Sequence, residues 1–325
     1  MVKLFVSGAS GVVGYGTLKS LRAAASKSQL FGSSIYNDSV APLFCDQFVL
    51  APPTNADHYL NWLSTTLQEN QIQLAFPGIE ADMRCWNKNR SLIEASGVKL
   101  MLNDEQLIHL SENKWAFYQE LEKGRLSCAI PTSISSDYKT VTADFGPNII
   151  VKPIAGFGSK GISKPRNEAE FEAIAQTIGD THIVQPIIGD DGNEYSISAF
   201  CHPTEGVCAS MGLKRKLSND GYTQHAEVID TAPFLETINE LIQLFRPIGP
   251  TNFQFRTQDN RNYLLEVNPR ISSATSIRTA FGYNEAEMAV RFFLENKLPS
   301  QPTILRGRAT RYIEDGIFYE NSNHI

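Results

Sequence analysis

The sequence predicts an α/β fold that begins with a Rossmann-like parallel sheet and takes an α+β arrangement in its C-terminal part. Strand and helix signals alternate through residues 4–102, as they do where crossover helices join parallel strands. In the C-terminal part, two β-rich runs instead flank a short turn, which favours an antiparallel hairpin. The chain has 325 residues, of which 42% are hydrophobic, so it can form two or three domains with substantial cores.

The expected elements follow in chain order. An apolar strand at 4–7 runs into a glycine-rich turn at 8–14, which opens a helix over 15–25. After it we expect strands at 48–50, 74–76 and 98–102, with helices at 59–68 and 84–95 between them. A middle region carries helices near 115–121 and 168–178 and a glycine-containing hairpin. From about residue 188 we expect strands at 195–201 and 207–213, a helix at 233–245, the C-terminal hairpin and a helix at 284–296.

The C-terminal hairpin carries the most informative residues. Its β-rich runs, 251–257 and 262–267, flank the turn-forming Asp259-Asn260-Arg261. Because alternate side chains of a strand share a face, Glu266 and Asn268 point the same way. We therefore expect both side chains on one face of the hairpin.

A magnesium site is the function that this face favours. Gln254 on the partner strand can reach the same face, so that with Glu266 and Asn268 it supplies three oxygen ligands. Such a set suits a hard cation that keeps some water and takes its remaining oxygens from phosphates. Arg270, two residues further on, adds a fixed positive fork beside them. Taken alone, the hairpin is explained equally well as a solvated rim with one ion pair.

A second segment favours nucleotide phosphates. Residues 148–153 form an apolar strand that carries Lys152 near its end, and the glycine-containing stretch 154–161 follows. Glycines let backbone amide groups turn toward a phosphate, and the lysine adds a point charge. The P-loop pattern G-x-x-x-x-G-K-[ST] is absent, so a hairpin tip that covers the phosphates fits better. A plain turn is the structural alternative.

A third segment favours an adenosine-binding hinge. Residues 182–189 form an apolar strand that runs through a Gly/Asp linker into an alternating strand at 193–198. Its backbone groups are placed to meet an adenine edge, and Glu194 is available for ribose hydroxyls.

The order of these parts is a lysine strand, a glycine loop, an apolar hinge, a carboxylate, a glutamine and then Glu266-Val267-Asn268-Pro269-Arg270. This order resembles the ATP-grasp superfamily, and most closely the carbamoyl-phosphate-synthase-like branch of its ligases, with a single ATP-grasp unit. The resemblance extends from the N-terminus to about residue 295. It implies a Rossmann-like domain at 1–106 and a two-lobed ATP-grasp fold. Its small lobe, at 107–187, would hold the glycine-rich phosphate loop, and its large lobe, at 188–325, the metal site.

The resemblance also implies a role for each matching position. ATP binding is implied for Lys114, Lys152, Gly156, Gly158, Ser159, Gly161, Gln185, Ile187, Ile188 and Glu194. Magnesium ligation is implied for Gln254, Glu266 and Asn268. Arg270 and Lys152 are implied as catalytic residues that hold charge during phosphoryl transfer. Pro186 departs from relatives that carry a side-chain donor there, which leaves the adenine contacts at that point open.

Such a residue set implies an ATP-dependent carbon-nitrogen ligase. A carboxylate is a poor electrophile, and phosphorylation by ATP turns its oxygen into a leaving group; an amine then attacks the acyl phosphate, and ADP and phosphate are released. ATP and Mg²⁺ are the implied cofactors, with Mn²⁺ as a substitute, and the partners are a small-molecule carboxylate and an amine. The sequence contains one ATP-grasp unit and no glutaminase-like segment, which argues against carbamoyl phosphate synthesis. Whether the chain forms a homodimer stays open.

Three groups are candidates for substrate binding. Arg278 follows the metal hairpin and is placed to act as a catalytic residue that holds an acceptor carboxylate, with a helix-face ion pair as the alternative. The cluster Lys214-Arg215-Lys216 could face an acidic substrate, but strand alternation puts its arginine opposite the two lysines. The last candidates are Glu80, Asp82 and Arg84. They follow an apolar strand, and parallel sheets bind ligands at the carboxyl ends of their strands.

Two other functions stay open. The glycine turn at 8–14 follows a strand and opens a helix, so it resembles the NAD(P)-binding turn of short-chain dehydrogenases and epimerases, and Asp38 lies at a tolerable distance for ribose. The Tyr-x-x-x-Lys pair of that family occurs only as Tyr15 and Lys19, inside the first helix, where it cannot also serve a substrate above the sheet. A non-catalytic nucleotide-binding protein is the third hypothesis. The intact set of Gln254, Glu266, Asn268 and Arg270 argues against it.

Composition excludes further partners. A formal net charge of −6 and a single short basic cluster argue against nucleic-acid binding. The five cysteines form no C-x-x-C pair and no zinc spacing, so we expect reduced, buried thiols. Met1-Val2-Lys3 leads into a strand rather than a signal peptide, and no apolar run approaches the roughly 18 residues of a membrane span. We therefore expect a cytoplasmic protein without membrane contacts.

Overall fold

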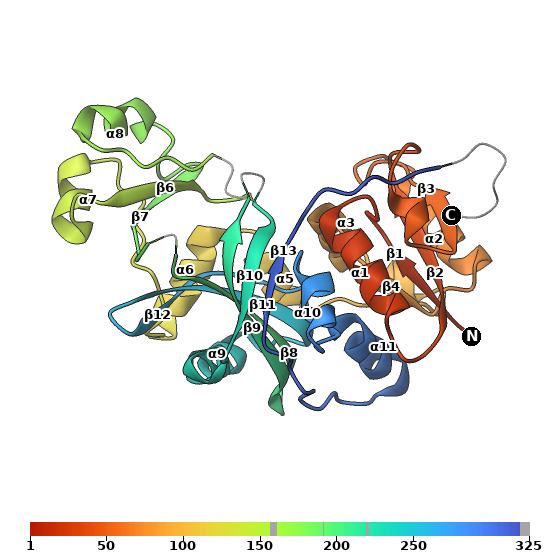
Figure 1. The fold of residues 1–325 in the computed structure, drawn as a ribbon. Coiled ribbons are helices and arrows are strands. Elements are labelled where there is room, and N and C mark those ends of the chain that lie inside the picture. Colours follow the sequence, from red (N-terminus) through yellow and green to blue (C-terminus); the bar gives the residue numbers. More distant parts are fainter. Residues whose placement is uncertain (157–160, 191, 219–220, 319–325) are drawn as a thin grey trace.

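Three sheets organise the chain in a computed structural model that describes residues 1–156, 161–190, 192–218 and 221–318 (Figure 1). A five-stranded parallel sheet comes first, followed by a two-stranded antiparallel sheet and a six-stranded antiparallel sheet. The predicted class, α/β at the N-terminus and α+β in the C-terminal part, is confirmed.

The N-terminal sheet has the strand order β3-β2-β1-β4-β5, and every neighbouring pair is parallel. Its strands are β1 (Val2–Val6), β2 (Ser28–Ser34), β3 (Gln47–Leu50), β4 (Leu74–Phe76) and β5 (Lys99–Leu100). The connections contain α1 (Val12–Arg22), the 3-10 turn η1 (Ala41–Leu43), α2 (Tyr59–Glu69), α3 (Glu80–Lys88) and α4 (Arg90–Glu94). The sequence analysis did not predict β2, and the helix expected over 84–95 starts at Glu80 and breaks at Asn89.

A small lobe lies at the opposite end of the molecule (green in Figure 1). Its strands β6 (Ile149–Pro153) and β7 (His182–Pro186) pair antiparallel, and α7 (Tyr138–Phe145) and α8 (Glu168–Ala175) pack with them. The lobe has its own core of Val141, Ile149, Val151, Phe171, Ile178 and Val184. Two helices of the range predicted as the small lobe, α5 (Glu105–Leu110) and α6 (Lys114–Lys123), pack instead against the central sheet.

The central sheet has the strand order β12-β11-β8-β9-β10-β13. Its strands are β8 (Glu194–His202), β9 (Gly206–Leu217), β10 (Thr223–Ile229), β11 (Gly249–Gln258), β12 (Arg261–Asn268) and β13 (Arg308–Thr310). The helices of this part are α9 (Ala232–Phe245), α10 (Thr275–Ala280) and α11 (Glu285–Glu295). One face of the sheet buries Ile197, Phe253 and Phe255 against α5, α6 and α9.

The opposite face of the central sheet shares a core with the N-terminal domain. Leu18 of α1 and Phe76 of β4 lie in one hydrophobic cluster with Phe200, Met211 and Tyr283. Burial of this apolar surface holds the two parts together. The N-terminal domain is therefore fixed beside the sheet face that carries the candidate site.

After β13 the chain crosses to the N-terminal domain (Figure 1), where Gly316 lies against Leu43. All five cysteines are free, but only Cys128 and Cys201 are buried; Cys45, Cys85 and Cys208 are partly exposed. Within the described ranges, no helix is long and apolar enough to cross a membrane.

Candidate functional site

The predicted C-terminal hairpin is present as β11 and β12. Asp259 and Asn260 join the strands with φ angles of 51° and 58°, the left-handed pair that a two-residue hairpin turn requires. The register places Glu266 opposite Gln254, and Asn268 points to the same face. Strand alternation thus brings the three predicted metal ligands together, as expected.

Glu266 and Asn268 contact each other on this face. Asn268 Nδ2 donates to Glu266 Oε1 at 2.9 Å, and Asn268 Oδ1 accepts from Arg270 Nη2 at 3.1 Å. Gln254 Oε1 accepts from Arg215 Nη2 at 2.5 Å. Each amide oxygen already accepts from an arginine and keeps a second lone pair for a cation. Among the described residues, no three His, Cys, Asp or Glu side chains form a metal-binding group, so a cation here would complete its shell with water or phosphate oxygens.

Glu194 lies between two arginines. Its Oε1 accepts from Arg215 at 3.1 Å from Nε and 2.9 Å from Nη2, and its Oε2 accepts from Arg256 Nη2 at 3.4 Å. The side chain of Glu194 is 11% exposed and that of Arg215 5%. Two charge-assisted hydrogen bonds to one sheltered oxygen fix the orientation of the guanidinium. The role of Glu194 at ribose stays a prediction, and in this structure the carboxylate holds two cations in place.

Lys152 extends from β6 toward the same face. Its Nζ donates to Gln185 Oε1 at 2.9 Å, and Gln185 Nε2 donates to Thr132 Oγ1 at 2.8 Å. The surrounding protein desolvates the ammonium and lowers the pKa of Lys152 to about 8, although the nearby carboxylate of Glu266 acts in the opposite direction. Gln185, which the resemblance assigns to adenine, here supports Lys152; its adenine role stays a prediction.

Lys114 approaches from the first residue of α6. Asn113 caps this helix by accepting from Ala116 N at 2.9 Å. The cap fixes the start of the helix and therefore the backbone position of Lys114. Its Nζ donates to the carbonyl oxygen of Gly156 at 2.9 Å. Desolvation lowers the pKa of Lys114, and the carboxylate of Glu266 opposes the shift. Two predicted phosphate contacts, Lys114 and Lys152, are thus both close to Glu266.

The ends of the glycine loop are visible. Gly156 and Gly161 have φ angles of 133° and 73°, a region that side chains rarely adopt. A Cβ at Gly161 would also lie 2.9 Å from Pro153 Cγ. These two glycines are required by the backbone path, whereas Gly158 and Ser159 lie outside the described residues.

A cavity of about 470 Å³ lies between the β6–β7 hairpin and the central sheet, within the range of small-molecule sites. Part of its wall is apolar: Ile150, Ile162, Pro186, Ile187, Ile188, Leu217 and Leu265. The charged residues that line it are the cations Lys114, Lys152, Lys164, Arg215, Lys216 and Arg256 and the carboxylates Glu194 and Glu266. An apolar wall together with an excess of positive charge is the complement of a nucleoside polyphosphate.

A smaller cavity of about 60 Å³ adjoins the first one and shares Lys114, Ile130, Gly156, Leu265 and Glu266 with it. The N-terminal domain reaches this cavity through α3. Glu80 Oε1 lies 2.6 Å from Arg270 Nη2, and Glu80 Oε2 lies 3.3 Å from Arg84 Nη2. Two of the three candidates in the N-terminal domain therefore line a site. The third, Asp82, is buried and accepts hydrogen bonds from Thr54 and Tyr59.

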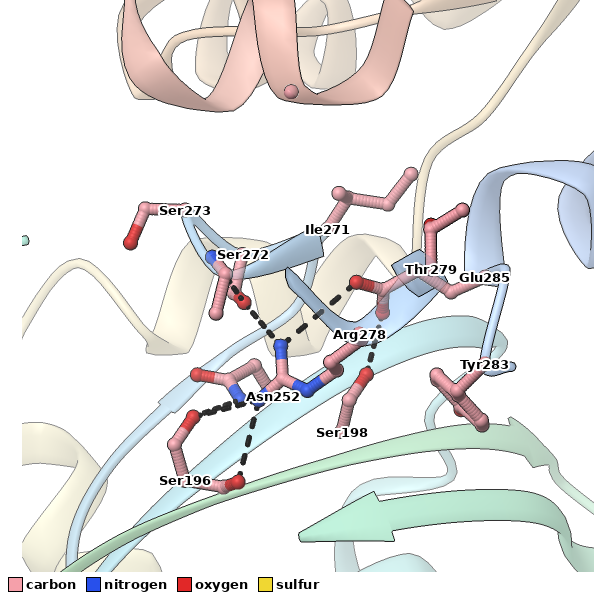
Figure 2. Close-up of polar contacts among 12 residues, drawn as sticks. Ser196, Ser198, Asn252, Ile271, Ser272, Ser273, Arg278, Thr279, Tyr283 and Glu285 are labelled. Carbon is pink, nitrogen blue, oxygen red and sulfur yellow. Dashed lines mark hydrogen bonds and ion pairs between the residues drawn. The ribbon is translucent and has the colours of Figure 1, made fainter. Parts of the chain in front are cut away.

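Arg278 lies at the centre of a buried polar cluster (Figure 2). Its Nη2 donates to Ser196 Oγ at 2.8 Å and its Nη1 to Ser272 Oγ at 2.5 Å. Nη1 is 3.9 Å from Glu285 Oε1, and Ser198 Oγ donates to Glu285 Oε2 at 2.5 Å. Arg278 and Glu285 are both 0% exposed, and neither lines the two cavities. The structure thus contains the ion pair that was the alternative reading of Arg278, and its role at an acceptor carboxylate stays a prediction.

Close packing accounts for the glycines of the N-terminal turn. A Cβ at Gly14 would lie 2.3 Å from the carbonyl oxygen of Gly8, and a Cβ at Gly78 would lie 2.0 Å from that of Ser7. The turn at the start of α1 and the loop after β4 therefore need glycine for their own contact, with or without a dinucleotide.

Comparisons with known proteins agree with this geometry. A family model described as "ATP-grasp in the biosynthetic pathway with Ter operon" matches residues 180–315. The N5-carboxyaminoimidazole synthetase of Staphylococcus aureus, solved with ADP, superposes with a TM-score of 0.74 at 16% identity, over 94% of this chain and 80% of that one. The chain has the ATP-grasp fold. The biotin carboxylase of Campylobacter jejuni gives the same TM-score at 16% identity, over 95% of this chain and 74% of that one.

The sequence is also similar to carbamoyl phosphate synthases, the branch that the resemblance named. The large chain of that enzyme from Agathobacter rectalis is 25% identical over 215 residues, or 61% of this chain and 20% of the relative. The large chain from Acidobacterium capsulatum is 25% identical over 224 residues, or 63% and 20%. This chain therefore spans about a fifth of the length of these relatives.

Sequence reasoning missed two cations that line the larger cavity. Arg256 was not singled out, and Arg215 was considered only as part of a basic cluster. As alternation predicts, Arg215 faces Glu194, while Lys214 lies on the other face, with its Nζ 6.0 Å from the centroid of the Tyr195 ring. Lys216 departs from that prediction, because it lines the same cavity as Arg215. The available signal was the spacing on β11, because Arg256 alternates with Gln254 and so shares its face.

Proposed function

We propose that this ATP-grasp protein is an ATP-dependent carboxylate-amine ligase that works through an acyl phosphate and releases ADP and phosphate. The cavity of about 470 Å³ carries the proposal, because its apolar wall and excess of positive charge lie beside Glu266. The structural neighbours support it, since one was solved with ADP and another as a beta-gamma-ATP complex.

Three groups of side chains serve the phosphates in this proposal. Lys152 is already held by Gln185, so its ammonium reaches a phosphate oxygen with little reorganisation. Arg215 and Arg256, positioned by Glu194, add fixed charge along the cavity wall. Arg270 lies beside Asn268 and stabilises the charge that develops as the phosphoryl group leaves ADP.

Mg²⁺ fits the oxygen donors of the hairpin. Glu266, Asn268 and Gln254 would hold it through their side-chain oxygens, while Arg215 stays paired with Glu194. When bound, the cation neutralises the β- and γ-phosphate oxygens and orients them. Mn²⁺ accepts the same oxygen donors and could substitute for it.

The bond changes are those of an acyl-phosphate ligase. A carboxylate oxygen of the substrate bonds to the γ-phosphorus, while the bond from this phosphorus to the bridging oxygen of ADP breaks. The amine then attacks the acyl carbon, phosphate leaves and the nitrogen loses a proton. No protein nucleophile is required. Burial raises the pKa of the Cys128 thiol to about 12, which keeps it protonated and unreactive.

Mg-ATP is expected to raise the melting temperature of the purified protein, because a ligand that binds only the folded state stabilises it by mass action, by about 2.7 kcal/mol at a hundred times its Kd. NADH and NADPH at the same concentrations are expected to produce no comparable shift. Differential scanning fluorimetry measures both. A shift with NADPH alone would favour the dinucleotide function of the N-terminal turn.

The activity itself is tested by ADP release. We expect release of ADP and phosphate, dependent on both a carboxylate and an amine, when the protein and Mg-ATP are incubated with a panel of the two substrates. Coupled spectrophotometric detection of ADP gives the rate. Binding of Mg-ATP without release of ADP for any pair would instead favour a nucleotide-binding protein without ligase turnover.

A further inference from the structure

We infer that the carboxylate substrate is a small α-amino acid with an apolar side chain, bound as a zwitterion in the cavity of about 60 Å³. The inference rests on the proposed function and deepens it by naming the substrate class. Its first support is the position of the cavity, which adjoins the nucleotide cavity and is lined by Glu266, Asn268 and Arg270. A ligand there lies next to the transferring phosphoryl group.

The polar side of this cavity alternates in charge. Arg270 pairs with Glu80 at 2.6 Å, Glu80 with Arg84 at 3.3 Å, and Arg84 with Glu112 at 3.6 Å between Nε and Oε1. Two arginines and two carboxylates thus follow one another from the metal hairpin through α3 of the N-terminal domain to Glu112, which lies between α5 and α6, behind the cavity wall. The buried Nε of Arg84 makes no hydrogen bond among the described residues. The two positive and two negative charges of this row cancel, and the Nε–H of Arg84 is still able to donate to a further acceptor.

A zwitterion can enter this row without leaving a charge unpaired. Glu80 and Arg270 are each 15% exposed, so both are largely desolvated, and a partner lost from such a pair is costly. A simple carboxylate would take Arg270 and leave Glu80 without its closest cation. The carboxylate of an amino acid replaces Glu80 at Arg270, while its ammonium replaces Arg270 at Glu80.

The other side of the cavity is apolar. Six buried hydrophobic side chains line it: Met83, Phe117, Leu121, Ile130, Leu264 and Val267. Burial of an aliphatic side chain against them is favourable by the hydrophobic effect. One water needs about 10–15 Å³ of such space, so about 60 Å³ suits a group of about four to six non-hydrogen atoms. Alanine, with six non-hydrogen atoms, is of this size, and valine, with two more, is at its upper margin, whereas aromatic amino acids are too large.

The orientation of the zwitterion determines its role. With its carboxylate on Arg270, the amino acid presents an oxygen beside Asn268 and Glu266, where the bond to the γ-phosphorus forms and ADP leaves. The product of this step is an aminoacyl phosphate. The ion pair with Glu80 keeps the α-ammonium protonated and therefore non-nucleophilic, so a second substrate supplies the attacking amine.

Paired substrates test the inference on the unaltered protein. ADP release is measured with hydroxylamine as amine and with alanine and valine, in both enantiomers, against propionate and 3-methylbutanoate, which lack the amino group. We expect at least one amino acid to exceed its analogue in kcat/KM by about tenfold or more, the value of a hydrogen bond to a charged group. ADP release with equal or greater kcat/KM for the analogues would overturn the inference and leave the proposed function intact.

Glu80→Gln tests the residue. It keeps the size of the side chain and removes its charge, so KM for the amino acid is expected to rise about ten- to a hundredfold, while KM for ATP stays unchanged. Glu287→Gln is the matched control, because Glu287 is 18% exposed, similar to Glu80, and pairs with Arg291 on α11, outside both cavities. An unchanged KM for the amino acid in Glu80→Gln would contradict the inference. Binding of Mg-ATP without ADP release from any carboxylate would contradict the proposed function and this inference with it.

Discussion

Glu266→Gln is expected to lower kcat for ADP release by about 100- to 1000-fold, the range found when one preorganised electrostatic contact to a transition state is removed. The amide keeps an oxygen that can accept from Asn268 Nδ2, as the carboxylate does at 2.9 Å, so the hairpin retains its hydrogen bond. It loses the negative charge that would hold Mg²⁺ beside the phosphates. Steady-state ADP release at saturating Mg-ATP measures the effect.

The folded state is expected to tolerate this change. Glu266 lines a cavity rather than a core, so the melting temperature without nucleotide should change by no more than about 2 °C. The shift produced by Mg-ATP should shrink, which separates loss of metal from loss of fold. Glu227→Gln serves as the control because Glu227 is exposed on β10 of the same sheet. Near-normal turnover in Glu266→Gln would remove Glu266 from the metal site.

The parts that the sequence predicted depend on local rules. The hairpin of β11 and β12 follows from two turn residues and from alternation, and these fix the register that puts Glu266 opposite Gln254. Lys152 was predicted because a strand carries it into a glycine stretch. Such relations extend over a few residues, so the sequence contains them in full.

The contacts that the sequence did not predict join distant segments. Arg215 meets Glu194 across two strands, and Glu80 of the N-terminal domain meets Arg270 across the domain boundary. The first pair depends on the register of β8 with β9, which places Tyr195 opposite Lys214 and so Glu194 beside Arg215. The second depends on how the N-terminal domain packs against the central sheet. The periodicity of a single segment predicts neither. The strand β2 was missed for another reason. It carries Gly32, Ser33 and Ser34, which have low strand propensity, and is stabilised by its position between β1 and β3.

Lys152→Met is expected to lower kcat/KM for ATP by about 100- to 1000-fold, because it removes one of the charges preorganised for the phosphates. Whereas the substitution lowers activity, it is expected to raise the stability of the folded state. The protein lowers the pKa of Lys152 from 10.5 to about 8, so the folded state disfavours the charged ammonium. Methionine fills similar space without that charge. At pH 7 the variant without nucleotide is therefore expected to be more stable than the parent, by at most about 3 kcal/mol, the free energy equivalent of the pKa shift.

The pH dependence of this stabilisation identifies its cause. Below pH 8 Lys152 is protonated in both states, and the folded state bears the whole penalty. Between pH 8 and 10.5 the unfolded chain binds more protons at this side chain, so the stability of the parent rises with pH and the difference from Lys152→Met falls away. Urea unfolding of parent and variant at pH 7 and pH 10 measures the difference, and Lys99→Met, at an exposed position on β5, corrects for the general titration of lysines.

The affinity for ATP is expected to depend on the protonation of the same side chain. Phosphates favour the charged ammonium, so the affinity of the parent should decline above pH 8, while that of Lys152→Met should not change for this reason. Two results would contradict the assignment of Lys152 as a phosphate-binding charge. One is a variant that is less stable than the parent at pH 7; the other is a variant whose affinity for ATP declines in parallel with that of the parent.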